Sequence, residues 1–441
     1  MRRAVLLAVL AACGGGGGGD KGVDKARGDG APVEVVERHG GGRPLPFEKE
    51  PNDSDEQATP LTVPGGARGV LTGANDADLY SFKVTERGAF DARLTGSGVD
   101  LVLELHSKEA LLAHSDRGPA GTAEGFPGFV LDPGDYLLLV REFHKPPPRK
   151  SSKKKKDEAD AGPPGRTGPS PPYQLTLGPA AAPQAHQEAE PDDETGTATE
   201  LGLGDEAIGW LGWTGDVDLW RVDVAEVRPG YCLDVEVAVP DGAEAALALL
   251  DDNADKLVER TGGRSEPVAV RALVPRPGDE HYYVRVSTRR SNPDEPYTLR
   301  VVARLHDLDL EAEPDDSDKT ATPLRDDPRE TGGTRHGWLG AGDVDYWRLP
   351  PGGSGVLTVV AAPPPEIDIK LVAVSGTATL EASTGKRGVT ERLDGLAVTE
   401  GEGIVLKVSG SGSSSAPYEL RWSVGQPAAP AYDPYEQPDE P

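Results

Sequence analysis

Apolar and polar residues alternate along many short stretches of the chain. Single polar residues separate Tyr80, Phe82 and Val84, and residues 220–224 repeat this alternation. A period of two places apolar side chains on one face of an extended segment, as in half-buried antiparallel strands. Gly, Pro and Asp clusters divide these stretches, and no apolar stripe with helical period and capping residues stands out. The pattern therefore predicts an all-β protein.

Further strands are predicted by the same alternation, and three of them begin with a glycine. They comprise residues 100–105, 134–140, 278–286, 367–372 and 401–408. Short strands separated by turn residues are typical of β-sandwiches.

Four landmarks occur three times in the same order. Each copy has Glu-x-Glu-Pro-Asn/Asp-Asp, then Asp-x-Asp before an aromatic residue, then a glycine-led strand, and finally Pro-Tyr. The copies begin at Glu48, Glu188 and Glu311, a spacing far above the roughly 20 to 50 residues of a solenoid repeat. We therefore expect three tandem jelly-roll-like β-sandwich domains.

The landmarks and the composition of the segments between them set the predicted boundaries. The parts are a signal segment (1–12), a Gly-rich flexible linker that starts at Cys13 (13–45), three sandwiches (46–179, 187–304 and 310–425), a basic insertion within the first (145–172), and a disordered acidic, Pro-rich tail (426–441). We interpret the insertion as a solvated loop. Its alternative role is to grip an anionic polymer or an acidic partner.

The first residues indicate the compartment. Arg2 and Arg3 precede the apolar run 4–10, which leads into Leu-Ala-Ala-Cys ending at Cys13. This order resembles the bacterial lipoprotein signal and its lipobox, which implies removal of residues 1–12 and acylation of Cys13. An ordinary secretory signal with a chance cysteine is the alternative. Acyl chains give stable membrane attachment, so we expect a lipid-anchored protein of the cell envelope, sorted to the outer membrane because Gly14 rather than Asp follows Cys13.

Charge and cysteine content narrow the partners. The formal net charge of −28 arises from 74 Asp and Glu against 46 Lys and Arg. Such a surface repels the phosphates of nucleic acid, so we expect cations rather than nucleic acid as partners. No other apolar run approaches the roughly 20 residues of a membrane helix. Cys232 lies in a strand-like alternation, which predicts a buried thiol without function.

The repeated landmarks resemble the bacterial pre-peptidase C-terminal domain over residues 48–178, 188–303 and 311–424. Relatives of this family follow the catalytic domains of secreted peptidases, and they include the collagen-binding domains of clostridial collagenases. The resemblance implies jelly-roll-like sandwiches. No peptidase domain precedes the repeats in this sequence, which leaves a binding or structural role for them.

The acidic motifs point to calcium on physical grounds. Glu-x-Glu on an extended segment and Asp-x-Asp at a strand start each place two carboxylates on one side, and a donor set of oxygens alone favours calcium over zinc or copper. The resemblance implies as ligands Glu48, Glu50, Asn52, Asp53, Asp76 and Asp78 in the first copy, Glu188, Glu190, Asp192, Asp193, Asp216 and Asp218 in the second, and Glu311, Glu313, Asp315, Asp316, Asp343 and Asp345 in the third. The alternative is that these are solvated turn carboxylates.

Catalysis is not expected. The sequence contains no Gly-x-Ser-x-Gly or His-Glu-x-x-His, and its eight histidines are scattered. We therefore expect a non-catalytic envelope lipoprotein whose calcium-stabilised sandwiches serve ligand binding, adhesion or envelope assembly, with an extracellular or envelope protein or a polysaccharide as the ligand. The alternatives are a structural spacer without a ligand, an accessory or hydrolytic protein linked to secreted peptidases, and an enzyme of unfamiliar type.

Overall fold

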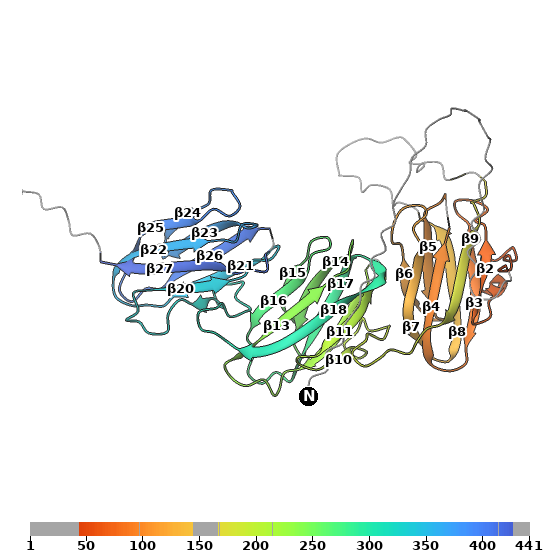
Figure 1. The fold of residues 1–441 in the computed structure, drawn as a ribbon, viewed down its shortest axis with the longest axis horizontal. Coiled ribbons are helices and arrows are strands. Elements are labelled where there is room, and N and C mark those ends of the chain that lie inside the picture. Colours follow the sequence, from red (N-terminus) through yellow and green to blue (C-terminus); the bar gives the residue numbers. More distant parts are fainter. Residues whose placement is uncertain are drawn as a thin grey trace, which may run out of the picture. The chain divides into compact units, whose positions relative to one another are not determined.

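β-strands make up the fold, and the described residues contain one short 3₁₀ helix, η1 (Asp55–Gln57) (Figure 1). The computed structural model describes residues 44–96, 98–143, 166, 168–213, 215–412 and 414–426. The predicted signal, the predicted acylation site Cys13, and most of the linker, basic insertion and tail lie outside these ranges. Within them, no helix is long and apolar enough to span a bilayer.

The first sandwich packs a five-stranded sheet against a four-stranded sheet. The larger sheet has the order β1 (Thr59–Pro60), β3 (Ala77–Val84), β8 (Gly134–Glu142), β5 (Leu101–His106) and β6 (Leu111–Ser115). The smaller has the order β2 (Gly65–Gly69), β9 (Tyr173–Pro179), β4 (Gly88–Thr95) and β7 (Glu124–Leu131).

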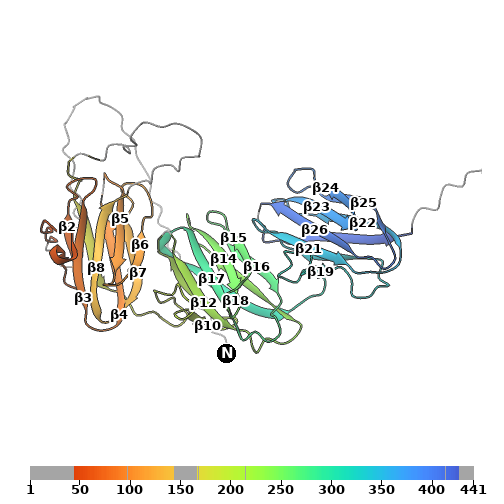
Figure 2. The same cartoon turned by 180° about the vertical axis from the view of Figure 1, so that it is seen from behind.

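The second sandwich repeats this architecture, and Figure 2 shows its strands β10 and β12 from behind. Its five-stranded sheet has the order β10 (Thr199–Leu201), β12 (Val217–Asp223), β17 (His281–Arg290), β14 (Glu244–Leu250) and β15 (Lys256–Thr261). Its four-stranded sheet has the order β11 (Glu206–Leu211), β18 (Asn292–Leu305), β13 (Tyr231–Ala238) and β16 (Val268–Leu273).

The third sandwich has the same strand order again. Its larger sheet runs β19 (Thr322–Pro323), β21 (Val344–Leu349), β26 (Ile404–Ser411), β23 (Asp368–Ser375) and β24 (Ala378–Ala382). Its smaller sheet runs β20 (Gly332–Gly337), β27 (Tyr418–Gly425), β22 (Gly355–Ala362) and β25 (Glu391–Val398). The prediction of an all-β protein with three sandwiches is confirmed.

Strand register is also repeated. The second aspartate of each Asp-x-Asp pairs with a valine of the neighbouring strand: Asp78 with Val140, Asp218 with Val286, and Asp345 with Val408. The short first strand of each larger sheet runs parallel to its neighbour. The sheets are therefore mixed, whereas the alternation predicted antiparallel strands throughout, because period two does not encode strand direction.

Two predicted strand starts are wrong. β8 begins at Gly134 as expected, but β17 begins at His281 and β26 at Ile404. Gly278 and Gly401 lie in the preceding turns with φ of 98° and 80°. This left-handed conformation favours glycine and ends a turn rather than starting a strand.

Large aromatic residues fill the cores between the sheets. Tyr80, Trp220 and Trp347 occupy equivalent positions and are completely buried. The thiol of Cys232 is free and buried, as predicted. The described residues from Leu45 onward form one compact unit. Within it, Trp213 packs against Phe126 of the first sandwich at a ring-centroid distance of 5.6 Å.

Candidate metal centre

Each acidic signature is an extended segment that joins the two sheets of its sandwich. In the second copy, the Glu188 N–H donates to the Ile208 carbonyl in the four-stranded sheet (3.0 Å). Four residues later, the Asp192 carbonyl accepts from the Leu219 N–H in the five-stranded sheet (3.2 Å). Equivalent bonds tie Glu48 and Asn52, and Glu311 and Asp315, to their sheets. The acidic side chains consequently converge with those of Asp-x-Asp at one end of the sandwich.

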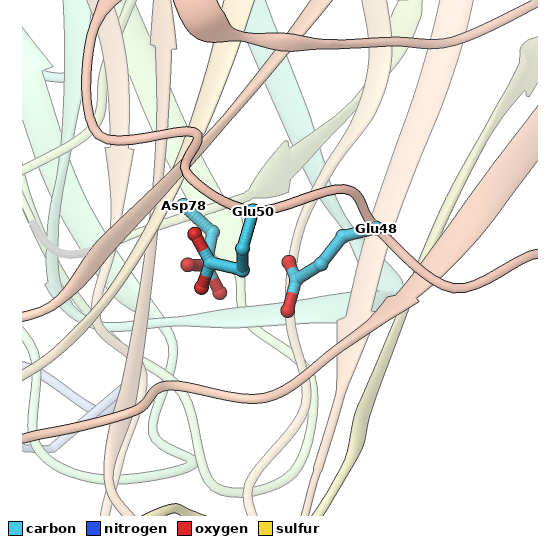
Figure 3. A group of neighbouring side chains, drawn as sticks. All are labelled: Glu48, Glu50 and Asp78. Atoms are coloured by element: carbon cyan, nitrogen blue, oxygen red, sulfur yellow. The ribbon is translucent and has the colours of Figure 1, made fainter.

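The first cluster brings together Glu48, Glu50 and Asp78, whose carboxylates gather in Figure 3. One ligand atom from each lies within 4.8 Å of the others. Burial raises the pKa of Asp78 to about 8, although the hydrogen bond from the Tyr173 hydroxyl lowers it. Glu50 is exposed and Glu48 half-buried, so this cluster is the more open to solvent.

Asn52 distinguishes the first copy, because aspartate occupies this place in the other two. The Asn52 amide nitrogen donates to Glu48 Oε2 (3.3 Å), and its buried Oδ1 accepts no hydrogen bond from the described residues. Asp76 accepts from the Thr72 N–H. The first cluster therefore contains one carboxyl group fewer than its counterparts.

The second cluster is completely enclosed. Its five carboxylates belong to residues that are at most 5% exposed: Glu188, Glu190, Asp192, Asp216 and Asp218. No lysine, arginine or histidine of the described chain forms an ion pair with them. Six of their oxygens are buried and accept no hydrogen bond there: Glu188 Oε2, Glu190 Oε1, Asp192 Oδ1, Asp216 Oδ1 and both oxygens of Asp218.

The electrostatics of the second cluster are unfavourable for a set of bare anions. Burial, together with the charges of Asp216 and Asp192, raises the pKa of Glu190 well above its ordinary value. Burial and the charge of Asp218 raise the pKa of Asp192 to about 9. Buried carboxylates of this kind either hold protons or require a cation. The ligand atoms of Glu190, Asp216 and Asp218 lie within 4.8 Å of one another, close enough to hold one metal ion.

The third cluster contains the same five acids and a cation. Glu311, Glu313, Asp315, Asp343 and Asp345 are at most 3% exposed. Arg260 of the second sandwich reaches them, with Nη2 contacting Glu313 and lying 2.6 Å from Asp343 Oδ1. Among the described residues, no metal-binding triad of the kind found in the first two clusters occurs here.

The last aspartate of each signature differs in burial from the residue before it. Asp53, Asp193 and Asp316 are exposed, because the side chain after each buried Asn52, Asp192 or Asp315 faces the opposite way. The structure thus brings together five of the six predicted positions in each of the second and third copies.

Tyrosine and glycine complete the site, although sequence reasoning gave them no part in it. Tyr173, Tyr297 and Tyr418 are buried, and the Tyr418 hydroxyl donates to Asp345 Oδ2 (2.5 Å). Each tyrosine pairs with a glycine, respectively Gly69, Gly209 and Gly337. The Gly-x-Leu that recurs before each Asp-x-Asp was the available signal for these glycines.

The donor chemistry fits a hard divalent cation. Carboxylate oxygens alone make up the unpartnered groups of the second cluster, and Ca²⁺ takes 6 to 8 such ligands in flexible geometry. Mg²⁺ demands octahedral geometry and retains several waters, which a fully enclosed group of carboxylates accommodates poorly. Glu190, Asp216 and Asp218 would hold the ion.

No family model and no curated protein matches the chain. Among solved structures, it has distant similarity to the pre-peptidase C-terminal domain of collagenase from Bacillus anthracis (16% identity, 31% of this chain, 99% of that chain, TM-score 0.19). Others are the CUB1-EGF-CUB2 domains of rat MASP-1 (10%, 52%, 100%, TM-score 0.16) and a Eubacterium rectale protein classed as secreted (8%, 53%, 81%, TM-score 0.18). Similarity at this level concerns the β-sandwich fold and does not identify a function.

Proposed function

We propose that this protein is a non-catalytic, calcium-binding protein of the cell envelope, built from three sandwiches of the pre-peptidase C-terminal type. The observation that carries the proposal is the second cluster, where five buried carboxylates face one another without a cationic side chain from the described residues. A bound calcium ion offsets this repulsion and connects the two sheets through the signature segment. Calcium thereby stabilises the module.

The attachment of these sandwiches to the cell envelope follows from the N-terminal residues. A lipid-modified Cys13 holds the protein in the envelope, and the Gly-rich segment after it separates the sandwiches from the membrane. In this arrangement the stabilised sandwiches serve adhesion, ligand capture or envelope assembly. The repetition of one scaffold three times favours binding or support over catalysis.

Calorimetric titration of the purified protein with Ca²⁺ and with Mg²⁺ tests the proposal. We expect calcium binding with a dissociation constant on the order of 10⁻⁴ to 10⁻³ M, as in extracellular modules, and much weaker magnesium binding. Asp218→Asn removes one buried charge at nearly constant volume and abolishes the site, whereas Asp193→Asn, at an exposed position in the same copy, leaves it intact. Equal affinity in the two variants would contradict the assignment.

A further inference from the structure

Arg260 lies in β15 of the second sandwich, but its charged group belongs to the acidic cluster of the third. Its Nη2 contacts Glu313 and lies 2.6 Å from Asp343 Oδ1, and its Nη1 lies 3.6 Å from Asp316 Oδ1. The side chain is 5% exposed. We infer that the Arg260 guanidinium is a permanent internal cation that occupies the third cluster in place of a metal ion and joins the second sandwich to the third. The part of this inference that concerns the excluded metal rests on the proposed calcium function.

The unpartnered oxygens of the two enclosed clusters support this division. In the second cluster, six buried carboxylate oxygens accept no hydrogen bond from the described residues. In the third cluster, two such oxygens lack a hydrogen bond, Asp315 Oδ1 and Asp345 Oδ1. The acids occupy the same register in both copies, since Asp218 and Asp345 face equivalent valines. Arg260 accounts for part of this difference, because it contacts Glu313 and Asp343. The remainder arises from the Trp338 N–H, which donates to Glu311 Oε2, and from the Tyr418 hydroxyl, which donates to Asp345 Oδ2.

Charge balance favours the guanidinium form of Arg260. Its charged group contacts the carboxylates of Glu313 and Asp343, so the buried positive charge has two buried negative partners. The planar guanidinium offers several donors at once, which suits a site bordered by Glu313, Asp343 and Asp316. Arg260, Glu313 and Asp343 form a buried ion-pair network, and Asp316 lies at its exposed edge.

Both joints between sandwiches share a backbone arrangement. The second glutamate of a signature accepts a hydrogen bond from the preceding sandwich: Glu190 O from Val130 N (2.7 Å), and Glu313 O from Val274 N (2.9 Å). The acidic end of each of these two sandwiches thus packs against its predecessor in the same way.

Strand register explains why Arg260 has no counterpart at the second cluster. At the joint between the first two sandwiches, Arg93 and Arg117 pair with Asp294 instead. Arg260 pairs with Leu247, which pairs with Val286. In the first sandwich the equivalent chain of partners runs from Val140 through Leu103 to Ser115. Ser115 therefore occupies the position in the first sandwich at which an arginine equivalent to Arg260 would be needed to reach the second cluster. The Ser115 hydroxyl instead donates to Glu124 Oε2 (2.6 Å).

The position of Arg260 also controls access to the third cluster. A cavity of about 570 Å³ is bordered by Arg260, Glu311, Glu313 and Asp343. A shorter, neutral residue at position 260 would leave a path from this cavity to the carboxylates. We therefore expect Arg260→Ser to create a calcium site that the natural protein does not have.

The experiment uses the full chain, as natural protein, Arg260→Ser and Arg260→Lys. Equilibrium dialysis with Ca²⁺ measures the number of ions bound per chain. We expect one more ion for Arg260→Ser than for the natural protein, and no additional ion for Arg260→Lys, which keeps the charge. An unchanged number in Arg260→Ser, in a protein that does bind calcium elsewhere, would overturn the inference.

Hydrogen exchange separates this inference from the proposed function. We expect the amides of Val274 and Glu313 to keep their protection when the natural protein is placed in chelator, because Arg260 holds the joint without metal. In Arg260→Ser, chelator should lower protection there at least tenfold, whereas Val130 should respond to chelator as it does in the natural protein. Loss of protection at Val274 in the natural protein on chelation would overturn the inference. A natural protein that binds no calcium yet shows the expected exchange would refute only the proposed function.

Discussion

Gly209 in β11 pairs with Tyr297 in β18, and the space beside the glycine is filled by the tyrosine ring and the carboxylate of Glu188. A Cβ on Gly209 would overlap with the Tyr297 hydroxyl and with Glu188 Oε2. The absence of a side chain at this position is therefore what allows tyrosine and glutamate to meet at the acidic cluster.

Gly209→Ala should destabilise the second sandwich by about 1–3 kcal/mol, the usual cost of inserting a methyl group into a packed site. It should also weaken calcium binding, because Glu188 must move. Urea unfolding and calcium titration check both effects. Gly196→Ala serves as the control, since a Cβ at Gly196 has open space around it. Equal stability of the two variants would contradict the packing argument.

The sequence allowed the sandwiches and most cluster residues to be predicted, because both depend on local pattern. Period two placed Tyr80, Phe82 and Val84 in a strand, and the structure buries all three in the core. The role of Gly209 was not predicted, because its neighbours Glu188 and Tyr297 come from distant parts of the chain and only the fold brings them together.

Calcium should reduce or cancel the loss of stability with rising pH that we expect for the metal-free protein. Burial and the charge of Asp218 raise the pKa of Asp192 to about 9, so in chelator the folded state binds more protons than the unfolded state. Stability is then greatest below pH 4 for this group and is lost as the pH rises toward 9. Calcium binding requires deprotonated carboxylates, so its affinity should increase over the same interval.

Melting temperatures at pH 5, 7 and 9, in chelator and in excess calcium, test the direction in which stability changes with pH. We expect a decline with pH in chelator that calcium reduces or cancels. Asp218→Asn should flatten the decline, because it removes one of the coupled charges. A metal-free protein that becomes more stable between pH 5 and pH 9 would argue against buried, protonated carboxylates.

Cys232 should be chemically inert in the folded protein. The thiol is completely buried, and burial raises its pKa to about 11, so thiolate is scarce at neutral pH. In a Cys13→Ser variant, we expect a thiol reagent to modify less than a tenth of the protein within an hour in buffer and all of it in denaturant. Rapid reaction under native conditions would mean that β13 opens readily.

Trp213 should couple the first two sandwiches. Its ring packs against those of both Phe126 and Phe129, with centroid distances of 5.6 and 6.0 Å. Trp213→Ala should cost about 3–5 kcal/mol at this contact and separate the thermal transitions of the two sandwiches in calorimetry. Trp213→Phe, which keeps an aromatic ring, should have a smaller effect. Identical thermograms for the natural protein and Trp213→Ala would contradict the coupling.

The contact that Arg260 makes between the second and third sandwiches could not be predicted from the sequence either. Residues 256–261 read Lys-Leu-Val-Glu-Arg-Thr, in which an arginine next to a glutamate resembles an ordinary solvent-facing residue of an edge strand. Its burial depends on the next sandwich, and local pattern carries no information about packing between domains. The equivalence of Ser115 and Arg260 could not be predicted from the sequence either, because only strand register shows that the two positions correspond.

Thermal unfolding in calcium, magnesium and chelator tests the central claim most directly, with Asp218→Asn and Asp193→Asn compared to the natural protein. At a calcium concentration 100 times the dissociation constant, binding should stabilise the second sandwich by about 2.7 kcal/mol, or roughly 10 °C. Asp218→Asn should melt higher than the natural protein in chelator, because it removes a buried charge, and should gain nothing from calcium. A gain that persists in Asp218→Asn, or that magnesium produces equally well, would contradict the account.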